Sequence, residues 1–174
     1  MAMLLKAMGL TAPSLYVAFG NKEKLFAEVI ERYVTTHAAK VVAPLASAPT
    51  ARDAIEQMLL ASASAVSSKN NPAGCLASFG AINSSDHSSK PVTMLRAVRD
   101  HTEQMIKERL DRALKTRELP TWLDTARLAR FYHAVMGGIQ LRSLDGASRA
   151  ELEAVAHDAM GVWPVSPAKR HQAR

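Results

Sequence analysis

The sequence has a single cysteine, few aromatic residues and no apolar run long enough to cross a membrane. Because Cys75 has no second cysteine to pair with, the chain can form neither an internal disulfide nor a cysteine-rich metal site. A lone thiol is typical of a reducing compartment. The apolar start of the chain ends at Lys6 and is too short to be the core of a signal peptide. We therefore expect no membrane association and no export.

The low aromatic content also bears on fold class. Aromatics make up 5% of the chain, whereas apolar residues make up 48% and include many alanines. This balance favours closely packed helices over a sheet of β-branched and aromatic residues. Apolar residues recur at spacings of three and four, and no alternating strand pattern is present. The sequence therefore predicts an all-α fold.

Capping residues and breakers divide the chain into expected helices. Thr11, Asn21 and Thr50 can each cap a helix start, and Ser148 with Glu151 forms a capping-box pair. The expected helices are a short one ending at Gly9, then Thr11 to Phe19, Asn21 to Val41, Thr50 to Val66, Pro91 to Leu114, one from Leu123 ending near Asp145-Gly146, and Ser148 to Trp163.

The segment from Gly9 to Phe26 has the layout of a helix-turn-helix. A turn after Gly9 is expected to point Leu10 inward and lead into a helix of two turns. Leu15 and Phe19, four residues apart, should face inward together. The outward residues of this helix would then be Pro13, Ser14, Tyr16 and Val17.

These outward residues suit a helix lying in the major groove of DNA. The Tyr16 phenol can bond a phosphate, and Lys22 adds a cation at a helix N-terminus, which favours anions. Ser14 can bond a base edge, whereas Pro13 and Val17 offer only apolar contacts, such as with a thymine methyl. Direct hydrogen-bond readout is therefore sparse, so DNA shape is expected to contribute. A net charge of +6 is compatible with nucleic acid.

The same segment resembles the signature of TetR-type transcriptional regulators. The matching runs are Gly9-Leu10-Thr11, Ser14-Leu15-Tyr16, Phe19-Gly20-Asn21-Lys22-Glu23 and Leu25-Phe26. The resemblance implies that Thr11 and Tyr16 touch phosphates, that Pro13, Ser14 and Val17 face bases, and that Lys22 is a basic contact. Ala18 departs from a position where the family often has histidine or tyrosine. The family body dimerises through its last two long helices and often holds a small-molecule effector.

A second departure lies at the start of the chain. The family usually has a whole first helix, and most of a second, before the equivalent of Met3. Without them, Leu15, Phe19 and Leu25 are expected to lose an inner partner, at about 1.5–3 kcal/mol for each exposed side chain. The head, a partial helix-turn-helix, is then expected to bind DNA poorly. The alternative function is a ligand-binding helical dimer that has lost DNA binding through truncation.

We expect three parts: a head with its connecting helix over 1–44, a ligand-binding and dimerisation body over 45–164, and a disordered basic tail over 165–174. Candidate pocket residues, each also a candidate for ordinary core, are Phe79, Met94, Met105, Phe131, His133 and Met136. Candidate dimer residues are Tyr132, Val135, Gly138, Ile139, Leu152, Val155 and Ala159. Glycines inside a helix cost about 1 kcal/mol each relative to alanine, so Gly137-Gly138 indicates the close approach of another helix.

The leading hypothesis is an effector-responsive repressor, a homodimer that binds a palindromic double-stranded operator in the bacterial cytoplasm. Its effector is a small molecule of unknown identity. A small helical enzyme is the third hypothesis, but no catalytic group, cofactor motif or metal spacing supports it. Cys75 is interpreted as an inert thiol, and the adjacent Asp86 and His87 are too few for a metal site.

Overall fold

The computed structural model describes residues 2–68, 73–81, 85 and 89–164, and within these ranges it contains helices and no strand. The helices are α1 (Ala2–Met8), α2 (Ala12–Phe19), α3 (Lys22–Tyr33), a π-helical turn η1 (Val34–Ala38), α4 (Ala39–Val42), α5 (Pro44–Ser47), α6 (Ala51–Val66), α7 (Leu76–Phe79), α8 (Lys90–Lys115), α9 (Thr125–Leu144) and α10 (Arg149–Met160). The all-α prediction is confirmed.

Four of the predicted helix starts are confirmed, and each rests on a local hydrogen bond; the helices expected from Pro91 and Leu123 instead begin at Lys90 and Thr125. Thr11, Asn21 and Thr50 accept from backbone N–H groups two or three residues into α2, α3 and α6. Ser148 and Glu151 form the expected capping box of α10. This last helix ends at Met160, earlier than the expected Trp163, because Gly161 caps it.

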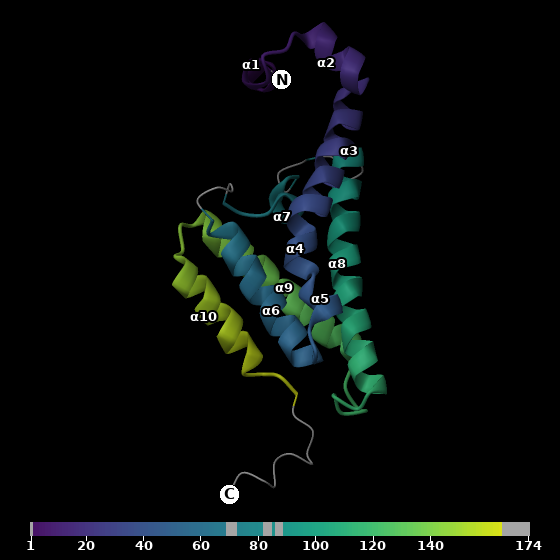
Figure 1. Ribbon diagram of the computed structural model, residues 1–174, viewed down its shortest axis with the longest axis vertical. Coiled ribbons are helices and arrows are strands. Elements are labelled where there is room, and N and C mark those ends of the chain that lie inside the picture. Colours follow the sequence, from purple (N-terminus) through teal and green to yellow (C-terminus); the bar gives the residue numbers. More distant parts are fainter. Residues whose placement is uncertain (1, 69–72, 82–84, 86–88, 165–174) are drawn as a thin grey trace, which may run out of the picture.

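The small head lies at one end of the molecule and is joined to the body by a long rod (Figure 1). The head consists of α1, α2 and the first turn of α3, and the rod consists of the rest of α3 with η1 and α4; the rod runs beside α8. Within η1 the helix widens to π geometry, which is uncommon and often marks a functional position. The Thr35 and Thr36 hydroxyls bond back to carbonyls of the preceding turn, a pattern that often bends helices.

The core of the body lies where α6, α8, α9 and α10 meet. One face of α6 supplies Ile55, Met58 and Leu59, all fully buried, and α8 adds Ile106 and Leu110. Full burial of one such side chain stabilises the fold by about 1.5–3 kcal/mol. These helices therefore form a rigid base against which the rod is held.

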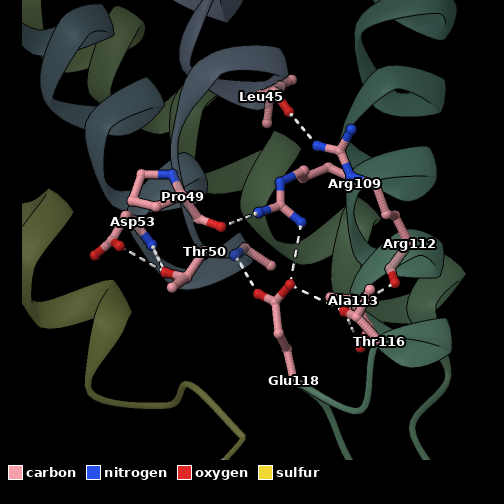
Figure 2. Close-up of polar contacts among 10 residues, drawn as sticks. Leu45, Pro49, Thr50, Asp53, Arg109, Arg112, Ala113, Thr116 and Glu118 are labelled. Carbon is pink, nitrogen blue, oxygen red and sulfur yellow. Dashed lines mark hydrogen bonds and ion pairs between the residues drawn. The ribbon is translucent and has the colours of Figure 1, made fainter.

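A polar cluster ties the α5–α6 bend to the end of α8, as Figure 2 shows. The buried Arg109 reaches the Pro49 carbonyl at 3.5 Å and Glu118 at 3.8 Å, while Arg112 donates to the Leu45 carbonyl at 3.1 Å. Glu118 also accepts from the Ala51 N–H at 2.7 Å. The Glu118 carboxylate therefore has two partners: it caps the start of α6 and it balances the charge of the buried Arg109 guanidinium.

Replacing Glu118 by Gln should lower the free energy of unfolding at pH 7 by about 1–3 kcal/mol, because a buried charge loses its partner. Partial burial opposes ionisation of Glu118, but the Ala51 N–H, Thr116 and the two arginines outweigh it and lower its pKa below 4.5. Because the pKa of Glu118 is lower in the folded than in the unfolded state, its ionised carboxylate stabilises the protein at pH values above the unfolded-state pKa. This stabilisation is lost as the pH falls through the folded-state pKa.

Urea unfolding of wild type and Glu118→Gln at pH 7 and about pH 4 measures the free energy of unfolding of each protein. The difference between the two proteins should be smaller at the lower pH. Glu108→Gln is the matched control, since Glu108 is exposed on α8 and bonds Gln104. The control should change stability by less than about 0.5 kcal/mol. Equal effects of the two variants would contradict the role given to Glu118.

Candidate DNA-binding interface

The α2 helix presents a continuous outward surface because its two ends are fixed. Thr11 caps it, and the Thr11 and Ser14 hydroxyl oxygens lie 2.9 Å apart. At the other end Gly20 takes φ +77°, a left-handed conformation that glycine adopts easily, and its N–H bonds the Tyr16 carbonyl at 2.8 Å. The hydrogen bonds at both ends therefore define α2 as a helix of two turns.

The inward side of α2 is anchored by Leu15, which is fully buried. Leu25 of α3 is 9% exposed, and Phe19 is half-buried. The expected loss of inner partners for Leu15 and Leu25 is therefore wrong, because α2 and α3 pack directly against each other. The expectation that Leu10 points inward is also wrong, since it is 37% exposed.

The structure places all six predicted DNA-binding residues on the exposed surface of the head. Val17 is 87% exposed and Tyr16 44% exposed, both high values for apolar or aromatic side chains on a short helix. The remaining exposed members are Thr11, Pro13, Ser14 and Lys22. Their positions agree with the predicted interface, and their contacts with DNA stay a prediction.

Two charged residues at this end were not predicted. The Lys24 side chain lies over the C-terminal end of α2, so close that a Cβ on Gly20 would sit 3.2 Å from its Cδ. A cation at a helix C-terminus is favourable. Glu23 forms an ion pair with Lys90 of α8 at 3.1 Å, which links the head to the body. Nothing in the local sequence indicates this second contact, because it joins residues far apart in the chain.

A cleft of about 1240 Å³ lies where the head, the rod and the body meet. Its apolar lining includes Met8 and Phe19 from the head, Val29 from the rod, and Phe79 and Val92 from the body. Phe79 is the only one of the six predicted pocket residues to line it.

The other predicted pocket residues lie elsewhere. Phe131 lines a separate groove with Trp122 and Trp163 near the far end of the body. His133 lies 3.3 Å from Glu103, Met136 is in the core, Met105 packs against that core, and Met94 is half-buried on α8. Among the described residues, the six candidates thus do not line the cleft together, and the effector pocket stays a prediction.

The predicted dimer residues also divide into two groups. Tyr132, Ile139 and Leu152 are at most 1% exposed and belong to the core of this chain. Gly138 and Val155 face outward, and Val135 and Ala159 are half-buried. Helical spacing alone placed both groups on one surface, although only the second is accessible to a partner.

Two absences concern the described residues alone. In this part of the chain no group of three or more His, Cys, Asp or Glu is placed to hold a metal ion. Asp86, His87 and the 165–174 tail lie outside the described residues. No single described helix is long and apolar enough to cross a membrane; α1 and α2 reach that length only as a pair bent by 84°.

Comparison with known proteins decides the family. The chain is 30% identical over 165 residues to the HTH-type transcriptional repressor ComR of Escherichia coli K12, covering 94% of this chain and 79% of ComR. This chain belongs to the TetR family of transcriptional regulators. Although no family model matches it, the match to a structure of the TetR family regulator CifR is close.

That structure is a cysteine mutant of CifR in complex with a 26-base-pair operator DNA. It shares 32% identity with this chain, covers 94% of this chain and 86% of CifR, and has a TM-score of 0.90. The reduced form of Escherichia coli NemR is 19% identical with a TM-score of 0.71, a likeness that shows the fold alone. These TetR-family relatives are transcriptional regulators and not enzymes.

Proposed function

We propose that this TetR-family chain is an effector-responsive repressor that binds operator DNA as a homodimer in the bacterial cytoplasm. The observation that carries the proposal is the exposed surface of α2, where Pro13, Ser14, Tyr16 and Val17 face outward beside Lys22. The likeness of the whole chain to an operator-bound regulator supports it. Nothing favours the alternative of a dimer without DNA binding.

In the proposed complex α2 enters the major groove. Thr11, Tyr16 and Lys22 bind phosphates and fix the register of the helix, because phosphate contacts orient a protein without reading sequence. Ser14 reads a base edge, while Pro13 and Val17 contact the apolar groove surface. Lys24 extends the positive charge at the same end of the head.

An apolar stripe on α9 supports the homodimer. Phe131, Ala134, Gly138 and Leu141 follow three/four spacing, and all are exposed; Phe131 and Leu141 are 39% and 49% exposed. Val155 on α10 and Val162 just after it are also exposed, at 41% and 61%, and Val162 lines the same groove as Phe131. Exposed apolar side chains that gather on one surface mark an interaction site.

Gly138 lies in the middle of the stripe. A Cβ at Gly138 would meet nothing within 4 Å in this chain, so packing within the monomer does not explain the glycine. A second copy lying across α9 would explain it, because glycine lets two helices approach closely. We therefore place the dimer contact on the α9 stripe and the outer face of α10.

The experiment that tests operator binding is a salt titration with DNA flanking the gene of this protein. Dimer heads reading successive major grooves should bind two half-sites about 34–36 Å apart. Affinity should fall by about tenfold or more between about 50 and about 200 mM salt, because bound cations release counterions from DNA. A scrambled DNA of equal length is the control. Affinity that stays constant with salt would refute the proposed interface.

A further inference from the structure

A groove of about 820 Å³ lies at the far end of the body, and we call it the aromatic groove after Trp122, Phe131 and Trp163 in its walls. Its lining comes from the connection before α9, the first two turns of α9 and the residues that follow α10. The volume is within the range of about 300–1,000 Å³ that is usual for small-molecule sites. None of the predicted DNA-binding residues lines it, so operator binding does not account for the groove.

Aromatic side chains are concentrated in this groove although they are scarce in the chain. The sequence has two tryptophans, and both of them line the groove. Trp122 is 72% exposed, a high value for a side chain whose large apolar surface is usually covered. The exposed indole therefore offers a flat apolar surface to a planar partner.

The walls of the aromatic groove are held in place by the core of the body. Phe131 and Trp163 both pack on the fully buried ring of Tyr132, with ring centroids 5.0 and 5.9 Å away from it. Leu123 and Leu128 pack against the same core. The groove is therefore formed before a ligand arrives, and a preformed site lowers the entropy cost of binding.

One cation of the aromatic groove has no partner of its own. Asp124, Arg127, Leu128 and Phe131 are three and four residues apart, so they share one face at the start of α9. The Asp124 carboxylate is used to cap α9, because it accepts from the Arg127 backbone N–H at 2.9 Å. The Arg127 guanidinium is exposed and forms no ion pair or hydrogen bond with another described residue. The groove thus offers a free guanidinium beside aromatic surfaces.

We infer that the aromatic groove binds a planar aromatic carboxylate. The ring of the ligand lies against Trp122 and Phe131, and the Arg127 guanidinium donates to the carboxylate, a group that matches its fork of N–H donors. A cationic ligand would also be attracted to the indole rings, but Arg127 would repel it. The inference goes beyond operator binding, because it concerns a site on the body that needs no DNA.

A second copy of the chain is the other occupant to consider, because Phe131 and Val162 belong both to the groove and to the apolar surface of the proposed dimer. In that homodimer the groove lies beside the contact between the two copies. A second copy seated in the groove itself would bury the Arg127 guanidinium, and burying a charge without a partner is costly. A ligand carboxylate supplies the missing negative charge.

Calorimetric titration of the DNA-free protein with β-naphthoate tests the inference, and β-naphthamide is the neutral ligand of nearly the same shape. The acid should bind about five- to tenfold more tightly than the amide, because hydrogen bonds between charged groups are stronger than those to a neutral group. The cation β-naphthylmethylammonium should bind more weakly than either. Equal affinities of the acid and the amide would overturn the inference, and so would tighter binding of the cation.

Arg127→Gln should lower the affinity for β-naphthoate about five- to tenfold, to that for the amide, and leave the affinity for the amide unchanged. Arg130→Gln is the matched control, since Arg130 is exposed on the same helix but does not line the groove. The control should keep the wild-type preference for the acid. If Arg127→Gln kept that preference too, the guanidinium would not hold the carboxylate and the inference would be wrong.

The two tryptophans report where the ligand binds. Each indole N–H gives one signal in a nitrogen–proton correlation spectrum, and both should shift as β-naphthoate is added, with the dissociation constant found by calorimetry. Trp122→Leu should weaken binding of the acid and the amide alike, by about two- to tenfold, because ring contacts do not depend on the charge of the ligand. Calorimetric binding without a shift of either indole signal would place the ligand elsewhere and overturn the inference.

The same titration on Ala134→Arg separates a ligand from a second copy. This substitution puts a charge on the α9 stripe at a residue that does not line the groove. Wild type and Ala134→Arg should bind β-naphthoate with similar affinity. If only Ala134→Arg binds it, the second copy occupies the groove in the wild-type dimer and the inference falls. Because no DNA is present, a failure of operator binding would overturn the proposed function and leave this inference standing.

Discussion

Replacing Ala134 by Arg should convert the protein to a monomer and weaken operator binding by about 100-fold or more. Ala134 is exposed between Phe131 and Gly138 on the α9 stripe. In a twofold interface every substitution occurs on both chains, so two guanidinium groups would be forced into apolar contact without a partner. A monomer can bind only one half-site. It therefore loses the increase in affinity that comes from binding two half-sites at once, which is about 10²–10⁴-fold.

The matched control is Ala97→Arg, which adds the same side chain at an exposed alanine of α8. Sedimentation velocity measures the oligomeric state, and fluorescence anisotropy with operator DNA measures affinity. Ala97→Arg should stay dimeric and bind like wild type. A dimeric Ala134→Arg variant would move the interface away from the stripe, and a monomeric one with undiminished affinity would show that pairing of heads is unnecessary.

Combining Tyr16→Phe with Lys22→Ala should weaken operator binding by about 100-fold at low salt. The first change removes the phenol hydroxyl, and the second removes a cation from the first turn of α3. Hydrogen bonds to charged groups are worth about 1.5–3 kcal/mol each, so losing two of them gives an effect of this size. The slope of log affinity against log salt should become shallower by about one for each lost lysine contact.

Neither residue has a structural role that would confuse the result, since both side chains are exposed. Lys40→Ala is the control, because it removes the same charge from exposed α4 in the rod. The operator affinity of Lys40→Ala should stay within about twofold of wild type, because a charge far from the DNA is screened by salt. If the double variant kept the wild-type salt slope, Lys22 would not touch a phosphate and the docking of α2 would need revision.

Local chemistry made the head predictable from the sequence. Thr11, Asn21 and Gly20 define the ends of α2 and α3 through hydrogen bonds that span at most four residues. Once the ends were fixed, the helical period set which side chains point away from Leu15. The outward surface of α2 was therefore predictable, as was the family to which its pattern belongs.

The same period could not divide α9 and α10 into inner and outer faces. Tyr132, Val135 and Ile139 share one apolar pattern, yet Tyr132 and Ile139 are buried in this chain and Val135 is only partly covered. Apolar spacing states that a face is covered, but not by which helix or by which copy of the chain. Only the packing of α6, α8 and α10 against α9 shows which face is left for a partner.

By itself, the sequence determined the all-α class, the starts of the helices capped by Thr11, Asn21, Thr50 and Ser148, and the exposed surface of α2, because these depend on neighbouring residues. Tertiary structure decided the Arg109–Glu118 cluster, the Glu23–Lys90 link, and the contacts of Tyr33 with Cys75 and of Ser78 with Gln140. Each of these joins residues from different helices, and no local propensity encodes such a meeting. Their geometry follows only when the helices have packed, and that packing is what connects the head to the body.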